Sequence, residues 1–138
     1  MRFHHCLAWL LLFLLLPGCG KSGQKVVSVS GRVTLDQRPL ANADVTFSPE
    51  SDSNDSARLE SSGKTDEQGN YSLKIIQDGR NGAVIGTHKV RISLIERGTT
   101  IVNRVPKEYN QATTLTCTVP AEGTKEANFD LKSQGPGN

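Results

Sequence analysis

The sequence predicts an all-β fold, a small antiparallel β-sandwich of about seven strands. Apolar and polar residues alternate with a period of two through most of the chain after residue 18, as in strands that are buried on one face. Clusters of Gly, Pro, Asn and Asp separate these segments at short intervals, which is typical of tight turns. Outside residues 1–18, no stretch of useful length has the 3.6-residue apolar stripe of an amphipathic helix.

The first predicted strand covers residues 27–35, with one alternating apolar set: Val27, Val29, Gly31, Val33 and Leu35. Because Gly31 has no side chain, we expect a bulge or a close backbone approach at this position. Residues 36–39 form a turn in which Pro39 fixes the backbone. The next strand covers residues 43–48, with Val45 and Phe47 facing inward, and Pro49 ends it. Residues 50–62 are polar and serine-rich, so we expect a long mobile loop.

A hairpin is predicted between residues 63–65 and 71–76. Asp66 is placed to accept turn amide protons, and Gly69 permits a positive φ. Tyr71, Leu73 and Ile75 share the inward face of the returning strand. Residues 77–82 form another turn.

The last predicted strands cover residues 86–94, 114–119 and 127–132. Their inward residues are Val90, Ile92, Leu94, Leu115, Cys117, Val119, Phe129 and Leu131. Residues 96–111 are the least regular stretch, an ordered connection pinned by Tyr109. The final two strands are predicted to be joined by a turn at residues 121–124.

Residues 1–18 have the pattern of an export signal, with Arg2 near the start and an apolar run over residues 7–16. Ten helical residues rise only about 15 Å, about half of the hydrocarbon thickness of a bilayer. Leu16-Pro17-Gly18-Cys19 resembles the lipobox of bacterial lipoproteins, which implies cleavage between Gly18 and Cys19 and acylation of Cys19. The alternatives are a plain secreted protein with an incidental Cys19, or an uncleaved signal anchor.

These patterns divide the chain into a signal peptide (1–18), a flexible tether (19–25), one β-sandwich domain (26–133) and a disordered tail (134–138). By analogy with lipoprotein sorting rules, Gly20 after the acylated residue favours the outer membrane. The 138 residues leave little room for a two-lobed enzyme. After residue 18 the chain has 15 Lys and Arg against 14 Asp and Glu and no Trp, so we expect no nucleic-acid partner.

Three motifs carry a family resemblance. Residues 29–47 resemble the opening "G-x-V-x-x-D-G-x-P-L-x-G-A-x-V" of carboxypeptidase regulatory-like domains, with Gln37 where Gly is usual. Residues 65–71 match the "T-D-x-x-G-x-Y" hairpin of that family, and residues 86–90 resemble its "G-x-Y-x-V" strand, with His88 in place of an aromatic residue. The resemblance implies a transthyretin-like Greek-key sandwich in which Pro39, Asp66, Gly69 and Tyr71 have structural roles.

The residues predict no catalytic site and no cofactor. After residue 18, His88 is the sole histidine, and we expect neighbours to pack against it on a strand face. Cys117 is left without an intramolecular disulfide partner and is expected to be a buried small hydrophobe. The acidic loop offers Asp52, Asn54 and Asp55 as candidate calcium ligands, but it lacks the glycine and distal Glu of a dedicated loop, which favours a solvated loop without metal.

The sequence therefore favours a non-enzymatic β-sandwich, anchored in the cell envelope by lipidated Cys19, that acts as a structural or protein-interaction module. The alternative is a binding module for envelope carbohydrate. Sugars usually dock on exposed aromatic rings, and Tyr109 is the candidate for that role because Tyr71 is expected to be buried. An exposed Tyr109 favours ligand binding, whereas an exposed sheet edge favours strand addition with a protein partner.

Overall fold

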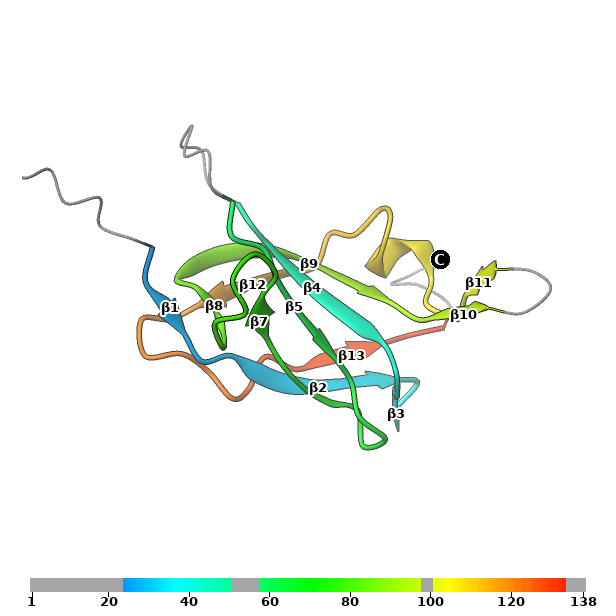
Figure 1. Cartoon of the computed structure of the whole chain (residues 1–138). Helices are drawn as coiled ribbons and strands as arrows, with labels where there is room; N and C mark the ends of the chain where they lie inside the picture. Colours follow the sequence, from blue (N-terminus) through cyan, green and yellow to red (C-terminus); the bar gives the residue numbers. More distant parts are fainter. Residues whose placement is uncertain (1–23, 51–57, 98–100, 134–138) are drawn as a thin grey trace, which may run out of the picture.

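The computed structural model describes residues 24–50, 58–97 and 101–133. Within these ranges the protein is an all-β sandwich, and its helical content is the single 3-10 turn η1 (Lys107–Tyr109) (Figure 1). No helix in the described ranges has the length and apolar character needed to cross a membrane. The predicted signal peptide with its cleavage pair Gly18 and Cys19, the tail, and the candidate calcium ligands Asp52, Asn54 and Asp55 lie outside the described residues.

The larger sheet has the strand order β12-β9-β4-β5-β7. Its strands are β4 (Asp44–Pro49), β5 (Ser61–Lys64), β7 (Lys74–Ile75), β9 (Gly86–Ser93) and β12 (Thr116–Val119). All of its pairings are antiparallel, and β9 returns to pair with β4, the first strand of the series β4, β5, β7. This order is that of a Greek key, so the predicted fold class is confirmed.

The second sheet is built on β2 (Ser30–Leu35), which lies between β13 (Phe129–Leu131) and β3 (Arg38–Pro39). β6 (Asn70–Ser72) also pairs with β2. Two small antiparallel pairs complete the described strands: β1 (Val26–Val27) with β8 (Ala83–Val84), and β10 (Ile95–Arg97) with β11 (Ile101–Asn103). β13 runs parallel to β2, which the expectation of a purely antiparallel sandwich did not include.

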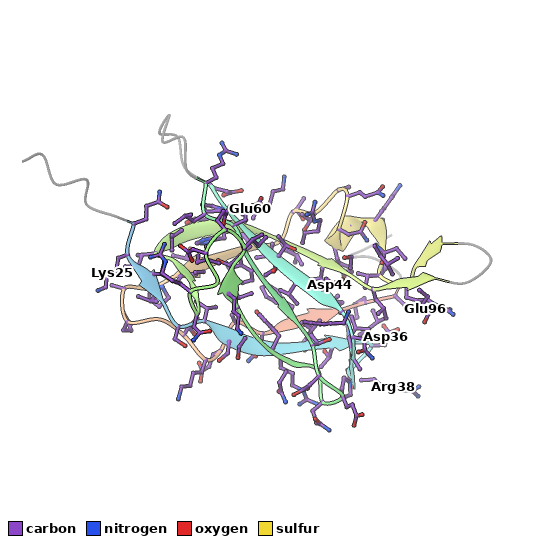
Figure 2. The ribbon with its side chains drawn as sticks, viewed as in Figure 1. Lys25, Asp36, Arg38, Asp44, Glu60 and Glu96 are labelled. Carbon is purple, nitrogen blue, oxygen red and sulfur yellow. The ribbon has the colours of Figure 1, made fainter. Side chains whose placement is uncertain are left out.

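The hydrophobic core fills the space between the two sheets. Alternation along each strand places the predicted apolar set inward, and Val33, Val45, Phe47, Val90 and Ile92 are all fully buried. The Phe47 and Phe129 rings, from opposite sheets, meet edge-to-face with centroids 6.2 Å apart. Charged side chains such as Arg38 and Glu96 extend away from the sheets (Figure 2).

The predicted strand 71–76 is divided between the two sheets. β6 pairs with β2, whereas β7 pairs with β5 in the larger sheet. Between them, the amide of Leu73 donates to the carbonyl of Val29 and its carbonyl accepts from the amide of Gly82, at 3.0 and 2.7 Å. The inward prediction for Tyr71, Leu73 and Ile75 is confirmed, because the chain keeps its alternation while it crosses from one sheet to the other.

Two element predictions need correction. β5 begins at Ser61 instead of residue 63, because Ser61 is fully buried between its ladder partners Phe47 and Ile75. Part of the irregular stretch 96–111 forms the β10–β11 pair. The predicted turn at residues 121–124 is confirmed by the 3.0 Å hydrogen bond from the amide of Gly123 to the carbonyl of Pro120, and it joins two strands, β12 and β13, that pair with β9 and β2 in different sheets.

The turn after β2 is formed by Asp36 and Gln37, both in the left-handed region with φ of 50° and 66°. Positive φ at both central residues is the requirement of a type I′ hairpin turn. Pro39 lies beyond this turn, in β3 opposite Thr34, so its predicted role in fixing the turn is wrong. As an exposed residue of a short edge strand, Pro39 costs the sheet no central hydrogen bond.

Candidate functional site

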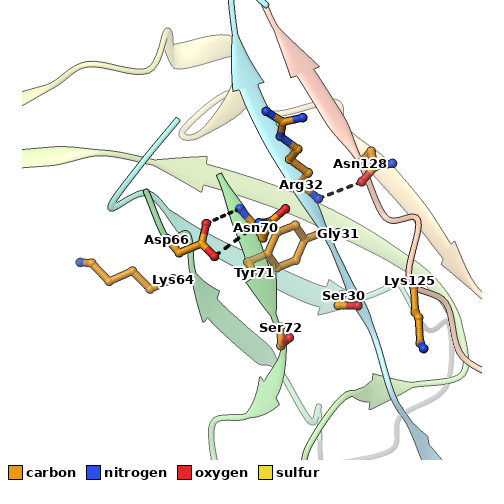
Figure 3. Close-up of a pocket in the computed structure, with 10 residues that line it drawn as sticks. All are labelled: Ser30, Gly31, Arg32, Lys64, Asp66, Asn70, Tyr71, Ser72, Lys125 and Asn128. Carbon is orange, nitrogen blue, oxygen red and sulfur yellow. Dashed lines mark hydrogen bonds between the residues drawn. The ribbon is translucent and has the colours of Figure 1, made fainter. Parts of the chain in front are cut away.

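A polar depression with a volume of about 520 Å³ lies where β2 and β6 meet the segment before β13 (Figure 3). It contains two of the predicted motif residues, Asp66 and Tyr71. The remaining lining residues come from β2, β5, β6 and residues 125–128: Ser30, Gly31, Arg32, Lys64, Asn70, Ser72, Lys125 and Asn128.

Two residues that line the depression, Gly31 and Tyr71, form a packed unit with Ala127. Gly31 and Tyr71 are partners in the β2–β6 ladder. The Tyr71 hydroxyl, on a residue only 4% exposed, donates a 2.6 Å hydrogen bond to the carbonyl of Ala127. A Cβ on Gly31 would lie 2.0 Å from that same carbonyl oxygen, which confirms the predicted close backbone approach. Burial raises the pKa of Tyr71 above its usual range, so its hydroxyl remains a donor.

Asp66 is committed to its own turn. Its Oδ1 accepts hydrogen bonds from the backbone amides of Gln68 and Asn70, at 2.9 and 2.8 Å. Gly69 has a φ of +80°, and its carbonyl accepts from the amide of Val33 at 2.9 Å. The predicted structural roles of Asp66 and Gly69 are therefore confirmed, and they position Asn70 at the edge of the depression.

Three of the four charged residues that line the depression, Arg32, Lys64 and Lys125, are cationic, and the fourth is Asp66. Lys64 and Lys125 lie on opposite sides of Tyr71 (Figure 3). The ammonium group of Lys64 is 3.7 Å from the carboxylate of Asp44, but both side chains are more than half exposed, and such pairs contribute little. Arg32 donates through Nε to the carbonyl of Gln68, and its backbone amide donates to Asn128 Oδ1. Ammonium groups and amides in this arrangement suit anions and hydroxyl-rich ligands.

His88 and Cys117 are neighbours, which no pattern in the sequence predicts. They are ladder partners across β9 and β12, so their side chains share one face. His88 is fully buried, its ring packs 5.6 Å from that of Phe47, and its Nδ1 lies 3.0 Å from the carbonyl of Gly86. Its Nε2 has no hydrogen-bond partner among the described residues.

The pKa shifts of this pair are opposite to those of a catalytic dyad. Burial lowers the pKa of His88, and burial raises the pKa of the Cys117 thiol. An activated nucleophile requires a depressed thiol pKa beside a charged imidazole. The neutral pair therefore acts in packing, and the prediction that Cys117 is buried is only partly met, because its side chain is half-buried at the edge of the core.

Tyr109 is buried, at 5% exposure, so it is not the exposed aromatic ring that sugar stacking would require. Its hydroxyl accepts a 3.2 Å hydrogen bond from the backbone amide of Lys132. This contact confirms that Tyr109 pins the connection between β11 and β12 to the end of β13. In residues 24–50, 58–97 and 101–133, no group of three or more His, Cys, Asp or Glu side chains could hold a metal ion.

Comparison with known proteins gives no assignment. No family model, no curated protein sequence and no solved structure matches the chain.

Proposed function

We propose that this chain is a non-enzymatic, lipid-anchored β-sandwich of the bacterial cell envelope, of the carboxypeptidase regulatory-like type, that acts as a structural or protein-interaction module. The observation that carries the proposal is that the side chains and backbone of the motif residues stabilise the fold. Asp66 caps its turn, Gly69 supplies a left-handed φ, and Tyr71 ties β6 to the segment before β13. These groups hold the sandwich together, so contacts with a partner would be made by its surfaces.

The anchoring part of the proposal is supported by the sequence pattern that ends in Cys19. Several acyl chains on one residue give stable attachment, because each buried CH₂ contributes about 0.8 kcal/mol. Residues 20–25 contain no apolar side chain, which suits a tether that holds the sandwich clear of the lipid surface.

The test is affinity capture of the full chain from bacterial envelopes, followed by mass spectrometry, with Cys19→Ala as the matched control. We expect an N-terminal acylated Cys19 peptide, membrane fractionation of the unsubstituted chain, and at least one envelope protein that co-purifies with it. Loss of membrane fractionation in Cys19→Ala is the expected control result. Membrane association of the cleaved Cys19→Ala protein would contradict the anchoring model.

A second candidate function is binding of envelope carbohydrate, and the polar depression favours an acidic glycan. Its donors are Lys64, Lys125 and the amide of Asn128. Burial of Tyr109 weighs against neutral sugars docked by ring stacking. Titration calorimetry with a uronic-acid polysaccharide should show salt-sensitive binding that is reduced in Lys64→Gln and Lys125→Gln and unchanged in Lys89→Gln, an exposed lysine of β9. Equal binding of a neutral polysaccharide would contradict this candidate.

A further inference from the structure

We propose that two copies of this chain pair through the free edge of β12, antiparallel about a two-fold axis at Cys117, to form one continuous sheet. The proposal rests on the proposed function as an interaction module and specifies its partner and contact. β12 is the terminal strand of the larger sheet, next to β9, and none of the described strands pairs with its other edge (Figure 1).

The hydrogen-bond pattern shows which backbone groups the free edge offers. The amide of Val90 donates to the carbonyl of Leu115 at 2.8 Å, so Leu115, Cys117 and Val119 direct their backbone groups toward β9. By alternation, the amides and carbonyls of Thr116 and Thr118 point away from the sheet. Both threonines are exposed. The edge therefore presents two donors and two acceptors at the spacing that another strand requires.

This edge lacks the features that usually prevent pairing between edges. Edge strands are commonly protected by charges, prolines or extreme shortness. The two-residue edge strands β3 and β7 contain Arg38, Pro39 and Lys74, and β13 contains Asp130. In contrast, residues 113–119 are Thr-Thr-Leu-Thr-Cys-Thr-Val, without charge or proline, and Pro120 ends the run. A neutral strand can face its own copy without like-charge repulsion.

Pairing about Cys117 matches side chains on both faces. Thr116 then lies opposite Thr118 of the second copy, a favourable cross-strand pair. Leu115 lies opposite Val119 of the second copy, and the half-buried Leu115 and Cys117 extend the inward apolar surface. The two Cys117 residues form a non-hydrogen-bonded pair, with Cα atoms about 4.5 Å apart, within the range of a disulfide.

The contact is small, which favours pairing at a membrane over pairing in dilute solution. Five residues from each copy bury far less than the ~1,200 Å² of a standard interface. Confinement of both copies to one membrane raises their effective concentration. A self-pairing edge therefore suits a tethered chain, and the thiols provide a reporter for it.

The experiment is oxidative crosslinking of the full chain in bacterial membranes, with Cys6→Ser as background. Diamide takes two electrons and two protons from two Cys117 thiols, which form the disulfide while diamide becomes the hydrazine. We expect a dimer band on non-reducing gels that is absent in Cys117→Ser. The rate of crosslinking by random collision is measured with the double variant Cys117→Ser, Thr87→Cys, which moves the thiol to an exposed position on β9 and gives the collision baseline. Crosslinking of Cys117 at or below this baseline would overturn the proposal.

Two charge variants test the register. Thr116→Lys with Thr118→Lys opposes like charges at two positions and should slow crosslinking about tenfold. Thr116→Glu with Thr118→Lys opposes unlike charges at the same positions and should restore it. Equal rates for the two variants, each checked for folding by its thermal transition, would overturn this register. If an envelope protein co-purifies with the chain but Cys117 does not crosslink, self-pairing is overturned and the proposed function is not. If membrane fractionation and co-purification are the same in Cys19→Ala as in the unsubstituted chain, the proposed function is overturned.

Discussion

Gly31→Ala tests the packed unit that Gly31 and Tyr71 form with Ala127. The new methyl group would lie 2.0 Å from the carbonyl oxygen and 2.4 Å from the carbonyl carbon of Ala127, so the backbone before β13 must move. Overpacking of this kind costs about 1–3 kcal/mol. The movement also breaks the 2.6 Å bond from the Tyr71 hydroxyl, and an unsatisfied buried donor costs about 1–3 kcal/mol.

Together these terms predict a loss of about 3 kcal/mol in the free energy of unfolding, a large share of the 5–15 kcal/mol typical of a domain. For a domain of this size, the melting temperature should fall by about 15 °C. Urea unfolding followed by circular dichroism, with calorimetry, measures both quantities. Gly79→Ala is the matched control: it has a φ of +74° with nothing within 4 Å of the added Cβ, so only about 1 kcal/mol of backbone strain is expected.

A double-mutant cycle separates the clash from the lost hydrogen bond. Tyr71→Phe alone should cost about 1–2 kcal/mol, because it removes the hydroxyl and leaves the ring in place. In the Gly31→Ala background the same change should cost less than about 0.5 kcal/mol, since the bond is already broken. Additive costs, or a loss below about 1 kcal/mol for Gly31→Ala, would refute the reasoning.

Three further predictions concern single side chains. Burial lowers the pKa of His88 in the folded chain, so as the pH falls the unfolded chain binds a proton at this residue before the folded chain does. The free energy of unfolding should therefore have its full value above about pH 6.5 and should fall as the pH drops through the folded-state pKa. His88→Phe should flatten this part of the pH–stability curve measured by urea unfolding, and an unchanged slope would assign it to another group. Asp66→Ala should lower the free energy of unfolding by about 1 kcal/mol, because it removes the two hydrogen bonds from turn amides, whereas the control Glu67→Ala should change it little. Thermal unfolding measures both, and equal losses in the two variants would argue against a capping role for Asp66. Burial raises the pKa of the Cys117 thiol, so iodoacetamide at pH 7 should alkylate Cys117 more slowly than it alkylates the cysteine of an unstructured peptide. The rate should be the same in His88→Phe, and a rate that depends on His88 would indicate an activated Cys–His pair.

Local patterns predicted which residues face the core, but not which strands become neighbours. Val45, Phe47, Val90 and Ile92 are all buried, because alternation is a property of each strand alone. The parallel alignment of β13 with β2 is instead fixed by contacts about 96 residues apart in sequence, such as Thr34 with Asp130. No local signal specifies such a partner.

In the candidate site, too, some features follow from local sequence and others from long-range strand pairing. Asp66 and Gly69 form a local turn, and their roles follow from the spacing of the motif. The depression also requires Lys125 and Asn128, which only the β2 pairing brings next to Tyr71. Likewise, the proximity of His88 and Cys117 follows from the β9–β12 register.

The two proposed contact surfaces lie on different parts of the sandwich. The depression is lined by residues of β2, β5, β6 and the segment before β13, and it includes none from β12. The free edge of β12 belongs to the larger sheet, at the opposite end from β5 and β7. Self-pairing would therefore leave Lys64, on β5, accessible in both copies. A pair of tethered sandwiches would present two such depressions to one acidic polymer, and bivalence would strengthen a contact that is weak in a single copy.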